Sequence, residues 1–496
     1  MPACPAEGAP RYRPRSASNP LKEIVEDALE DLLQFWDERF ANEHGPLHPR
    51  VKKLFEAFTR CGDLSFGFLR LRCSNPECPK KGELLLGYSC KVRGLCPSCG
   101  QRRAIEWAER MVEEVLPRVP YRQLVFTIPR RFRKFFLFDR SLYGKLCRAA
   151  HSATRDFLRE RVPGGFPKLK RAVPAMVVVP QSFGDLLVHH PHAHALCSLG
   201  LFLPDGSFFA MDDVDFTGLE DLFRERVFAF LIKAGKITAE VAEDMRHWPH
   251  SGFQADFQRK LQADDRKGLE GLLGYMDRPP VSLRRLTYLA NGLVHYQGTK
   301  AHPRLETDHQ LLPAVDFLAL LVSHVMLRYQ VTIRTYGALS TTFRKRVGWV
   351  ENPPVHEPPR EALTSPAATL QAAAGTRPPV PAPELMRKTA SEEESEFANK
   401  QRSRWARLLG KTYLVDPELC PACGERMKII AGLTSPHQDE AIEKILRHVG
   451  LWDPPWKRER KARGPPLSHQ DSGDSLEEVD DLFSTGPIDP PWEDDI

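Results

Sequence analysis

The sequence lacks the features that would place a chain in a membrane or outside the cell. No apolar run approaches the roughly 18 residues that a membrane-spanning helix needs. The first twenty residues, MPACPAEGAPRYRPRSASNP, contain no apolar core of the kind found in secretory signal peptides. We therefore expect a cytoplasmic protein with no membrane partner. No internal repeat is apparent.

Cysteines are scarce over most of the chain, and their uneven distribution argues against a disulfide framework. Five of the 11 cysteines lie between Cys73 and Cys99, and a close pair lies at Cys420 and Cys423. In a reducing compartment such clustering favours metal binding over disulfides.

Length and charge set broad limits on the protein. The chain has 496 residues, 42% hydrophobic and 27% charged, which is enough for a large core and several domains. The formal net charge is +5, although the last stretch, DSGDSLEEVDDLFSTGPIDPPWEDDI, is strongly acidic. The preceding part is therefore more basic than the total indicates, which favours a polyanionic partner.

Two hydrophobic periods alternate along the chain and predict an α+β fold. Helical spacing occurs in residues 21–40, 50–58 and 102–116, and the stretch 132–161 is also typical of helices. Short β-branched or apolar runs at 121–129, 172–180, 190–203 and 206–211 predict strands of an antiparallel sheet. The turn residues Pro204, Asp205 and Gly206 predict a hairpin between the last two.

One of the predicted strands begins with HHPHAHAL at residues 189–196. Alternate side chains of a strand share a face, so His190, His192 and His194 are expected to project the same way. Such histidines can converge on one metal ion. The alternative is a polar edge strand with histidines satisfied by hydrogen bonds.

A second candidate residue lies near the end of a predicted helix in the sequence DRKGLEGLLGYMDRPP. Leu269, Leu272, Leu273 and Met276 form its apolar stripe, and Tyr275 lies to one side of that stripe. The prolines that follow end the helix near Arg278. A tyrosine here either packs at a core margin or, beside a metal-polarised phosphate, acts as a nucleophile.

The N-terminal cysteines have the spacing of a zinc site. Cys73-x4-Cys78 and Cys96-x2-Cys99 form two close pairs, with Cys90 as a fifth cysteine, and two such pairs supply a tetrahedral zinc site. Basic residues around the cluster suit contacts with phosphates. They are Lys91, Arg93, Arg102 and Arg103.

The C-terminal pair Cys420-x2-Cys423 forms a similar turn without a second cysteine pair nearby in sequence. His437 and His448 could complete a second zinc site, or the turn could be free of metal. A thioredoxin-like redox motif is less consistent with the sequence, because no βαβ pattern surrounds the pair.

The stretch PRRFRKFFLF mixes cations with aromatic residues. Arg131, Arg133 and Lys134 could neutralise phosphates while the phenylalanines stack on single-stranded bases. The alternative, which we favour for the phenylalanines, is an amphipathic helix with aromatic residues in the core. They are Phe132, Phe135, Phe136 and Phe138.

Six motifs taken together resemble the IS91/ISCR family of rolling-circle transposases, in the family's order, from about Leu21 to Trp452. They are FTRCGDLSFGFLRLRC with CPKKGELLLGYSCKVRGLCPSCGQRRA, YRQLVFTIPRRFRKFF, HPHAHAL, LLGYMDRPPVSLRRLTYLANGLVHYQG, RTYGALSTTFRKRV and RWARLLGKTYLVDPELCPACGERMKIIA. The resemblance implies an HUH endonuclease fold, a ferredoxin- or RRM-like antiparallel sheet flanked by helices. It also implies a bacterial protein that acts on DNA.

In that family, His-hydrophobic-His residues hold Mg²⁺ or Mn²⁺ and a helix-borne tyrosine forms a 5′-phosphotyrosine intermediate. The resemblance places these roles on His192, His194 and Tyr275, and we add His190 as the third ligand from its position on the same face. Arg278 is expected to steady the phosphate. Gly271 stands where two-tyrosine members have another tyrosine, as in the single-tyrosine branch, so a released 3′-OH or a second protomer of a homodimer would complete strand transfer.

The predicted organisation follows from the motifs and composition. It comprises a disordered N-terminus (1–20), a helical and zinc-binding DNA-recognition domain (21–116), an HUH catalytic domain (117–350), a Pro-rich linker (351–400), a small CxxC domain (401–452) and a charged, acidic tail (453–496).

We expect a transposase that nicks and rejoins single-stranded DNA at element ends. Two alternatives remain. One is a zinc-dependent DNA-binding or regulatory protein with a decayed nuclease site, and the other is a hydrolase that uses metal-bound water.

Overall fold

The computed structural model describes residues 19–78, 83–162, 171–211, 214–248, 250–299, 307–326, 330–348, 351–356, 419–420 and 422–452. The predicted acidic tail, and most of the predicted N-terminal segment and linker, lie outside these residues. Within the described residues, no helix combines the length and apolar character needed to cross a bilayer.

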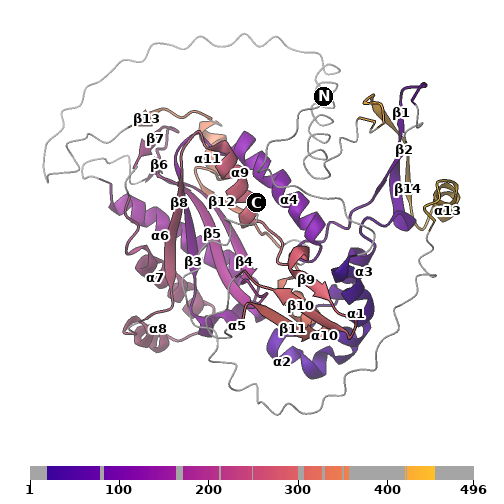
Figure 1. The fold of residues 1–496 in the computed structure, drawn as a ribbon. Coiled ribbons are helices and arrows are strands. Elements are labelled where there is room, and N and C mark those ends of the chain that lie inside the picture. The colour runs from indigo at the N-terminus through magenta and orange to yellow at the C-terminus, as the bar shows by residue number, and fades with distance from the viewer. Residues whose placement is uncertain are drawn as a thin grey trace, which may run out of the picture.

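A five-stranded antiparallel sheet forms the centre of the molecule (Figure 1). Its strand order is β12-β4-β5-β3-β8, so that β5 lies in the middle. The strands are β3 (Tyr121–Thr127), β4 (Ala175–Phe183), β5 (His189–Ser198), β8 (Gln254–Leu261) and β12 (Arg334–Gly337). The α+β prediction is confirmed, as are the strands predicted at β3, β4 and β5. Strands β8 and β12 were not among the predicted strands.

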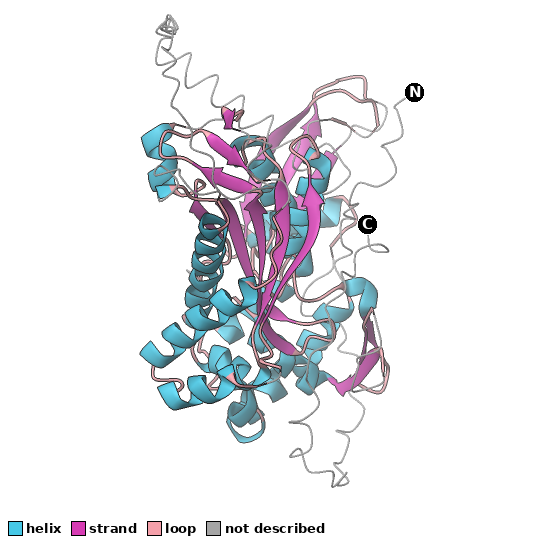
Figure 2. Cartoon of the chain, turned by 90° about the vertical axis from the view of Figure 1, so that its left-hand side faces the viewer, coloured by secondary structure: helices cyan, strands magenta, loops and turns pink. Residues whose placement is uncertain are grey.

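Helices cover both faces of this sheet, as Figure 2 shows. Ala193, Ala195 and Cys197 of β5 belong to the core on one face, whereas Leu196 belongs to the core on the other. The first face is covered by α5 (Arg130–Phe138), α6 (Leu142–Glu160) and α7 (Leu219–Lys233), with α8 (Ala239–Arg246) beside α7. The second is covered by α4 (Pro97–Arg110), α9 (Arg266–Met276) and α11 (Thr341–Val347).

A second core joins segments from both sides of the predicted boundary at 116/117. The N-terminal helices pack against α10 (Ala314–His324) and a three-stranded sheet, with Trp36, Phe55 and Phe317 fully buried between them. The helices are α1 (Pro20–Arg39), α2 (Ala41–His44) and α3 (Val51–Thr59), and the strands are β9 (Leu286–Tyr288), β10 (Leu293–Gln297) and β11 (His309–Pro313). The predicted boundary therefore does not separate two cores.

Two small sheets complete the fold. The first has the order β14-β1-β2, so the C-terminal segment joins the N-terminal cysteine region. Its strands are β1 (Gly67–Cys73), β2 (Glu83–Gly87) and β14 (Met427–Thr434), with α13 (Asp439–His448) packed on them. The second consists of β6 (Gly200–Phe202), β7 (Phe208–Ala210) and β13 (Val355–His356). The segment predicted as a separate CxxC domain thus shares a sheet with β1.

Candidate active site and metal centres

The central strand β5 presents two histidines toward α9. His192 lies opposite Gln181 of β4 and Thr127 of β3, and His194 lies opposite Val179 and Val125. Because neighbours occupy both edges of β5, the sheet itself fixes where the two imidazoles point. His192 and His194 are only 5% and 3% exposed.

The two imidazoles converge on one point. The Nε2 atoms of His192 and His194 are 3.1 Å apart. Adjacent ligand atoms of an octahedral divalent ion, each about 2.2 Å from the metal, are about 3.1 Å apart. Burial, together with the positive charges of Arg278 and Arg133, lowers the pKa of His192 to about 4, and burial also lowers the pKa of His194. Both rings are therefore neutral near pH 7, which is the form that binds a metal.

His190 contributes to this pair through its backbone. Its carbonyl oxygen accepts a hydrogen bond from Nδ1 of His192 at 2.7 Å, which leaves the Nε2 lone pair of His192 free for a ligand. The two rings are stacked with their centroids 5.0 Å apart. Among the described residues, groups of three or more ligand atoms within 4.8 Å of one another consist of cysteines alone, so His190 does not join His192 and His194 in such a group.

Gln181 is a site residue that the sequence analysis missed. Its Nε2 donates to the carbonyl oxygen of Met276 at 2.9 Å, which ties the end of α9 to the sheet. Its Oε1 is buried and, within the described part of the chain, has no hydrogen-bond partner. The cross-strand position opposite His192 depends on strand register, which the sequence alone did not reveal.

The helix α9 brings Tyr275 against the histidines. Leu269, Leu272, Leu273 and Met276 are buried, which confirms the predicted apolar stripe. Asp265 caps the helix by accepting from the backbone N–H of Gly268, and the helix ends at Met276, three residues before Pro279. The ring of Tyr275 is half-buried and lies edge-on to the ring of His194, with the centroids 5.6 Å apart.

Arg278 also packs against the ring of Tyr275. Its guanidinium carbon is 4.6 Å from the Tyr275 ring centre and 5.6 Å from that of Phe183. Its Nε is buried and has no hydrogen-bond partner among the described residues. The guanidinium is thus held by stacking while it retains donors for an anion.

A cavity of about 60 Å³ continues from Arg278 toward α4. Arg93, Arg103 and Asp277 line it together with Gln181. Burial raises the pKa of Asp277 to about 6, and Arg103 lies 3.9 Å from its carboxylate. Three arginines, Arg278 among them, and one carboxylate thus line the cavity.

The remaining predicted phosphate contacts have mixed surroundings. Lys91 is exposed, with a positive φ of 55°. Arg102 forms an ion pair with Glu106 at 2.7 Å along α4.

Phe132 and Phe136 are fully buried in the core, which confirms the core interpretation for these two, whereas Phe138 is 50% exposed.

The cysteines regroup into two clusters, so the predicted set Cys73, Cys78, Cys96 and Cys99 is wrong as a single site. The first cluster consists of Cys61, Cys90, Cys96 and Cys99. Its Sγ–Sγ distances include 3.6 Å, 3.7 Å and 3.8 Å. Four thiolates about 2.3 Å from a zinc ion lie about 3.8 Å apart, whereas a disulfide bond is about 2.0 Å long.

Cys61 was missed because it stands 29 residues before Cys90. It follows the end of α3, while Cys96 and Cys99 lie at the start of α4, so the cluster ties these helices together. Further along, α4 packs on α9, and a Cβ on Gly100 would lie only 2.9 Å from Pro279. The first cluster is thereby connected to the helix that carries Tyr275.

The second cluster consists of Cys73, Cys78, Cys420 and Cys423. The Sγ atoms of Cys73 and Cys423 are 3.4 Å apart, and those of Cys78 and Cys420 are 3.8 Å apart. The partners of the C-terminal pair are therefore N-terminal cysteines. His437 and His448, considered as partners from sequence, are not among the four.

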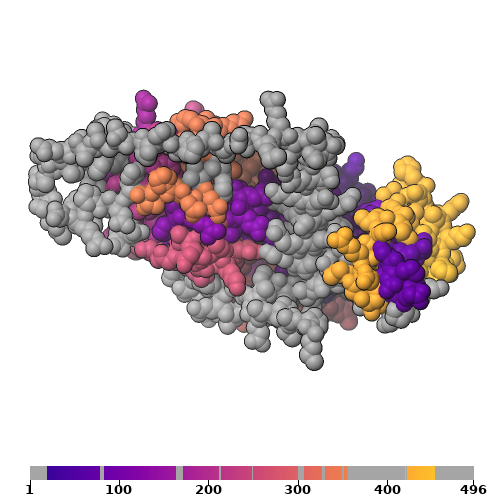
Figure 3. All heavy atoms as spheres, turned by 90° about the horizontal axis from the view of Figure 1, so that it is seen from above, coloured from indigo at the N-terminus to yellow at the C-terminus, as the bar shows by residue number. Residues whose placement is uncertain are grey.

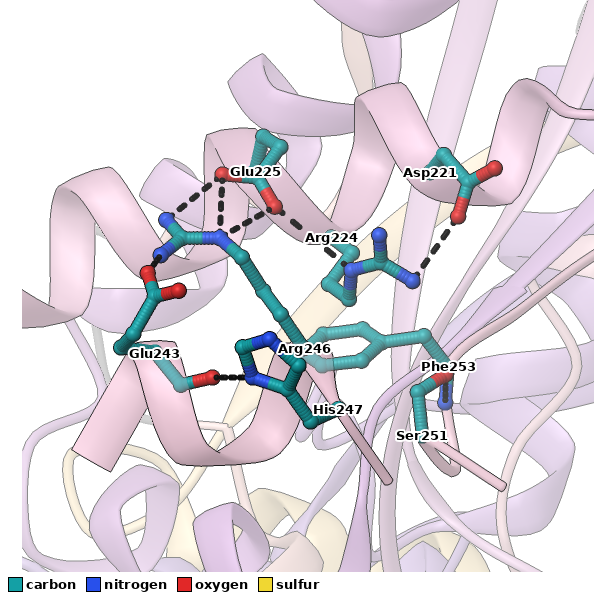
Figure 4. Close-up of polar contacts among 8 residues, drawn as sticks. All are labelled: Asp221, Arg224, Glu225, Glu243, Arg246, His247, Ser251 and Phe253. Carbon is teal, nitrogen blue, oxygen red and sulfur yellow. Dashed lines mark hydrogen bonds and ion pairs between the residues drawn. The ribbon is translucent and has the colours of Figure 1, made fainter. Parts of the chain in front are cut away.

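A larger hollow, of about 500 Å³, is lined by residues of α7 and α8. These helices lie away from α9 in Figure 1. Arg246 and Glu243 of the hollow's lining pair with each other, and further ion pairs lie next to them on α7. Arg246 binds Glu225 and Glu243, and Arg224 binds Asp221, as Figure 4 shows. Because these cations are neutralised by their neighbours, we assign no chemistry to this hollow.

Comparisons with known proteins find transposases over most of the chain. The family model described as "Transposase zinc-binding domain" matches residues 32–128, and the model described as "Putative transposase" matches residues 175–346. The "Transposase for insertion sequence element IS801" of Pseudomonas savastanoi pv. phaseolicola is 24% identical over 452 residues, covering 86% of this chain and 92% of the relative.

A second relative is the "Putative transposase y4qJ" of Sinorhizobium fredii (strain NBRC 101917 / NGR234). It is 23% identical over 338 residues, covering 64% of this chain and 81% of the relative. No solved structure gives a significant match. The two family models together with these relatives show that the chain belongs to the IS91 family of transposases.

Proposed function

We propose that the chain nicks and rejoins single-stranded DNA at the ends of a mobile element through a 5′-phosphotyrosine at Tyr275, in an HUH-type site. One observation carries the proposal: His192 and His194 converge to 3.1 Å, and the ring of Tyr275 lies against His194. The tyrosine that we propose as nucleophile and the histidines that we propose as metal ligands thus lie on a helix and a sheet that share a core.

The metal in this proposal is Mg²⁺ or Mn²⁺, held by the two Nε2 atoms. The buried Oε1 of Gln181 is a neighbouring oxygen without a partner among the described residues, which suits a hard cation. The predicted third ligand, His190, instead orients His192 through its carbonyl oxygen. When bound, the ion would polarise the scissile phosphate.

The tyrosine supplies the covalent step. The phenol oxygen of Tyr275 bonds to phosphorus, its proton passes to water, and the bond from phosphorus to the 3′ oxygen breaks. The 3′ oxygen takes up a proton and leaves as a hydroxyl group. Arg278, stacked on Tyr275 with a free donor, is placed to neutralise the phosphate charge.

The first cysteine cluster would hold structural zinc and fix the start of α4. Arg93 and Arg103 line the same cavity as Arg278, so a DNA phosphate held at Arg278 would lie near these cations. Single-stranded DNA suits this site, because the scissile phosphate must approach a half-buried tyrosine that contacts His194 and Arg278.

The test uses 5′-labelled and 3′-labelled single-stranded oligonucleotides carrying the ends of the encoding element, incubated with Mg²⁺ or Mn²⁺. We expect an adduct that survives denaturing electrophoresis on the 3′ fragment, a free 3′-OH on the other fragment, and no adduct with Tyr275→Phe. Cleavage that persists in Tyr275→Phe would indicate hydrolysis by metal-bound water. Zinc-dependent binding without any cleavage would indicate a DNA-binding protein with a decayed site.

A further inference from the structure

We propose that the second cysteine cluster is a zinc clasp that holds the C-terminal segment of the chain onto the N-terminal zinc-binding region. The clasp consists of Cys73, Cys78, Cys420 and Cys423. Two of its ligands lie beyond residue 346, where the matches to the family models end. The proposal concerns assembly of the chain and does not depend on the DNA chemistry at Tyr275.

The geometry of the sulfur atoms is that of a tetrahedral site. All four Sγ atoms lie within 4.8 Å of one another, and the two cross-segment distances are 3.4 Å and 3.8 Å. These values are close to the edge of a zinc tetrathiolate, about 3.8 Å, and far from a disulfide bond length of about 2.0 Å. Cys78 and Cys420 are buried, so the thiols are enclosed by protein.

The backbone around each pair is shaped for thiolate ligands. On the N-terminal side, the N–H of Asn75 donates to the sulfur of Cys73 at 3.4 Å. On the C-terminal side, Gly424 donates its N–H to the carbonyl oxygen of Cys420 at 2.8 Å and has a φ of 75°. This left-handed conformation favours glycine and closes a tight turn around the pair.

Strand pairing brings the two segments together at the cluster. β14 runs antiparallel to β1, with Cys73 opposite Met427, and Ser74 donates its N–H to the carbonyl oxygen of Arg426 at 2.9 Å. Gly67 lies at the other end of the pairing, where a Cβ would be 2.5 Å from the carbonyl oxygen of Leu433. Figure 3 shows the C-terminal segment, in yellow, against the N-terminal strands.

The local apolar core is too small to hold this unit alone. Apart from two of the cysteines, its buried members are Leu71 and Met427, with Phe68, Leu433, Ile442 and Leu446 in a neighbouring cluster. Units with so little buried apolar surface usually depend on a metal or a disulfide. A chain without residues 419–452 would leave Cys73 and Cys78 with only half of the ligand set.

Metal content tests the site. The full chain, purified under reducing conditions, should contain two zinc ions, and the double variant Cys420→Ser/Cys423→Ser should contain one. The matched control is Cys147→Ser/Cys197→Ser, which changes two buried cysteines outside both clusters and should retain two. Cys423→His, which keeps a zinc ligand, should also retain two. Unchanged zinc content in the Cys420/Cys423 variant, or two disulfides in the wild type, would overturn the proposal.

A second experiment tests the clasp itself. A protease site is inserted between residues 366 and 390, and the cut protein is passed over a sizing column. We expect the C-terminal fragment to elute with the rest of the protein, and to separate from it after chelation of zinc or in Cys73→Ser. Fragments that separate with zinc bound, or remain together after its removal, would show that zinc does not hold the segments together. Neither readout depends on DNA cleavage.

Discussion

The histidine site and the cysteine clusters are both candidate metal centres, but they are built in opposite ways. His192 and His194 are two residues apart on one strand, whose position is fixed by β4 and β3 and by large cores on both faces of the sheet. Cys73 and Cys423 are 350 residues apart and meet beside a core of very few side chains. The fold thus positions the histidines by itself, whereas in our proposal Cys73, Cys78, Cys420 and Cys423 depend on zinc to hold their segments together. Loss of the divalent ion from His192 and His194 should therefore stop DNA cleavage, whereas loss of zinc from the cysteine clusters should weaken the fold.

The largest effect is expected on catalysis. His194→Ala removes one of the two converging nitrogens, so adduct formation should fall by about a hundredfold or more. The melting temperature should change little, because the sheet and the core around β5 remain. Adduct yield and thermal unfolding measured on the same preparation test both statements. His295→Ala, on β10, is the control. A variant that keeps its activity would remove His194 from the site.

The second effect is expected on stability. Cys61→Ala should remove one zinc ion and lower Tm by about 10 °C, since loss of a structural metal is among the most destabilising single changes. Cys147→Ala also removes a buried sulfur, but from outside the clusters, and should cost only about 1 kcal/mol. Zinc analysis and calorimetry distinguish the two variants. If Cys61→Ala and Cys147→Ala lowered Tm equally, the cysteines of the first cluster would be ordinary core side chains that bind no zinc.

A third prediction concerns pH. His324 donates from Nε2 to the carbonyl oxygen of Leu187 and is hydrogen-bonded through Nδ1 to Ser182, so it anchors the hairpin that leads into β5. Burial lowers its pKa to about 4. In the unfolded chain this imidazole is protonated below about pH 6.5, whereas in the folded chain it stays neutral down to about pH 4. The free energy of unfolding therefore decreases as the pH falls from 6.5 toward 4.

A histidine with this lowered pKa decreases the free energy of unfolding by about 2 kcal/mol when the pH falls from 7.5 to 5. His151, whose pKa burial also lowers to about 4, acts in the same direction. Urea unfolding at the two pH values should show a smaller loss in His324→Gln than in the wild type. An equal loss in both proteins would exclude His324 as a source of the acid sensitivity.

The smallest effect is expected at Gly271, where the two-tyrosine branch of the family carries its other tyrosine. A Cβ at this exposed helical position meets nothing within 4 Å. Gly271→Ala should therefore raise the free energy of unfolding by about 0.5–1 kcal/mol through helix propensity and leave adduct formation unchanged. Loss of activity in this variant would mean that the substrate occupies the space beside the glycine.

Local spacing explains what could be predicted from sequence. The alternation in β5 and the apolar stripe of α9 each lie within about a dozen residues, and both are present in the structure with the predicted faces. The approach of Tyr275 to His194 follows no short-range pattern. It was expected from the resemblance to the family and is present in the structure.

Long-range pairing explains what could not be predicted. Cys96 and Cys99 are joined by Cys61 and Cys90, and the partners of Cys423 and Cys420 lie 350 and 342 residues earlier in the sequence. The position of Gln181 opposite His192 likewise depends on the register of β4 against β5. Spacing identifies which cysteines bind in pairs, but strand pairing decides which pairs meet.

The central claim is that Tyr275 attacks DNA, and mapping of the linked peptide tests it most directly. The chain is incubated with Mg²⁺ and the single-stranded element end, the covalent complex is digested, and the nucleotide-bearing peptide is sequenced by mass spectrometry. Our account predicts a 5′-phosphate linkage on Tyr275 in the tryptic peptide of residues 268–284, because trypsin does not cleave between Arg278 and Pro279. A linkage on another residue, such as Tyr336, or cleaved DNA with no linked peptide, would contradict it.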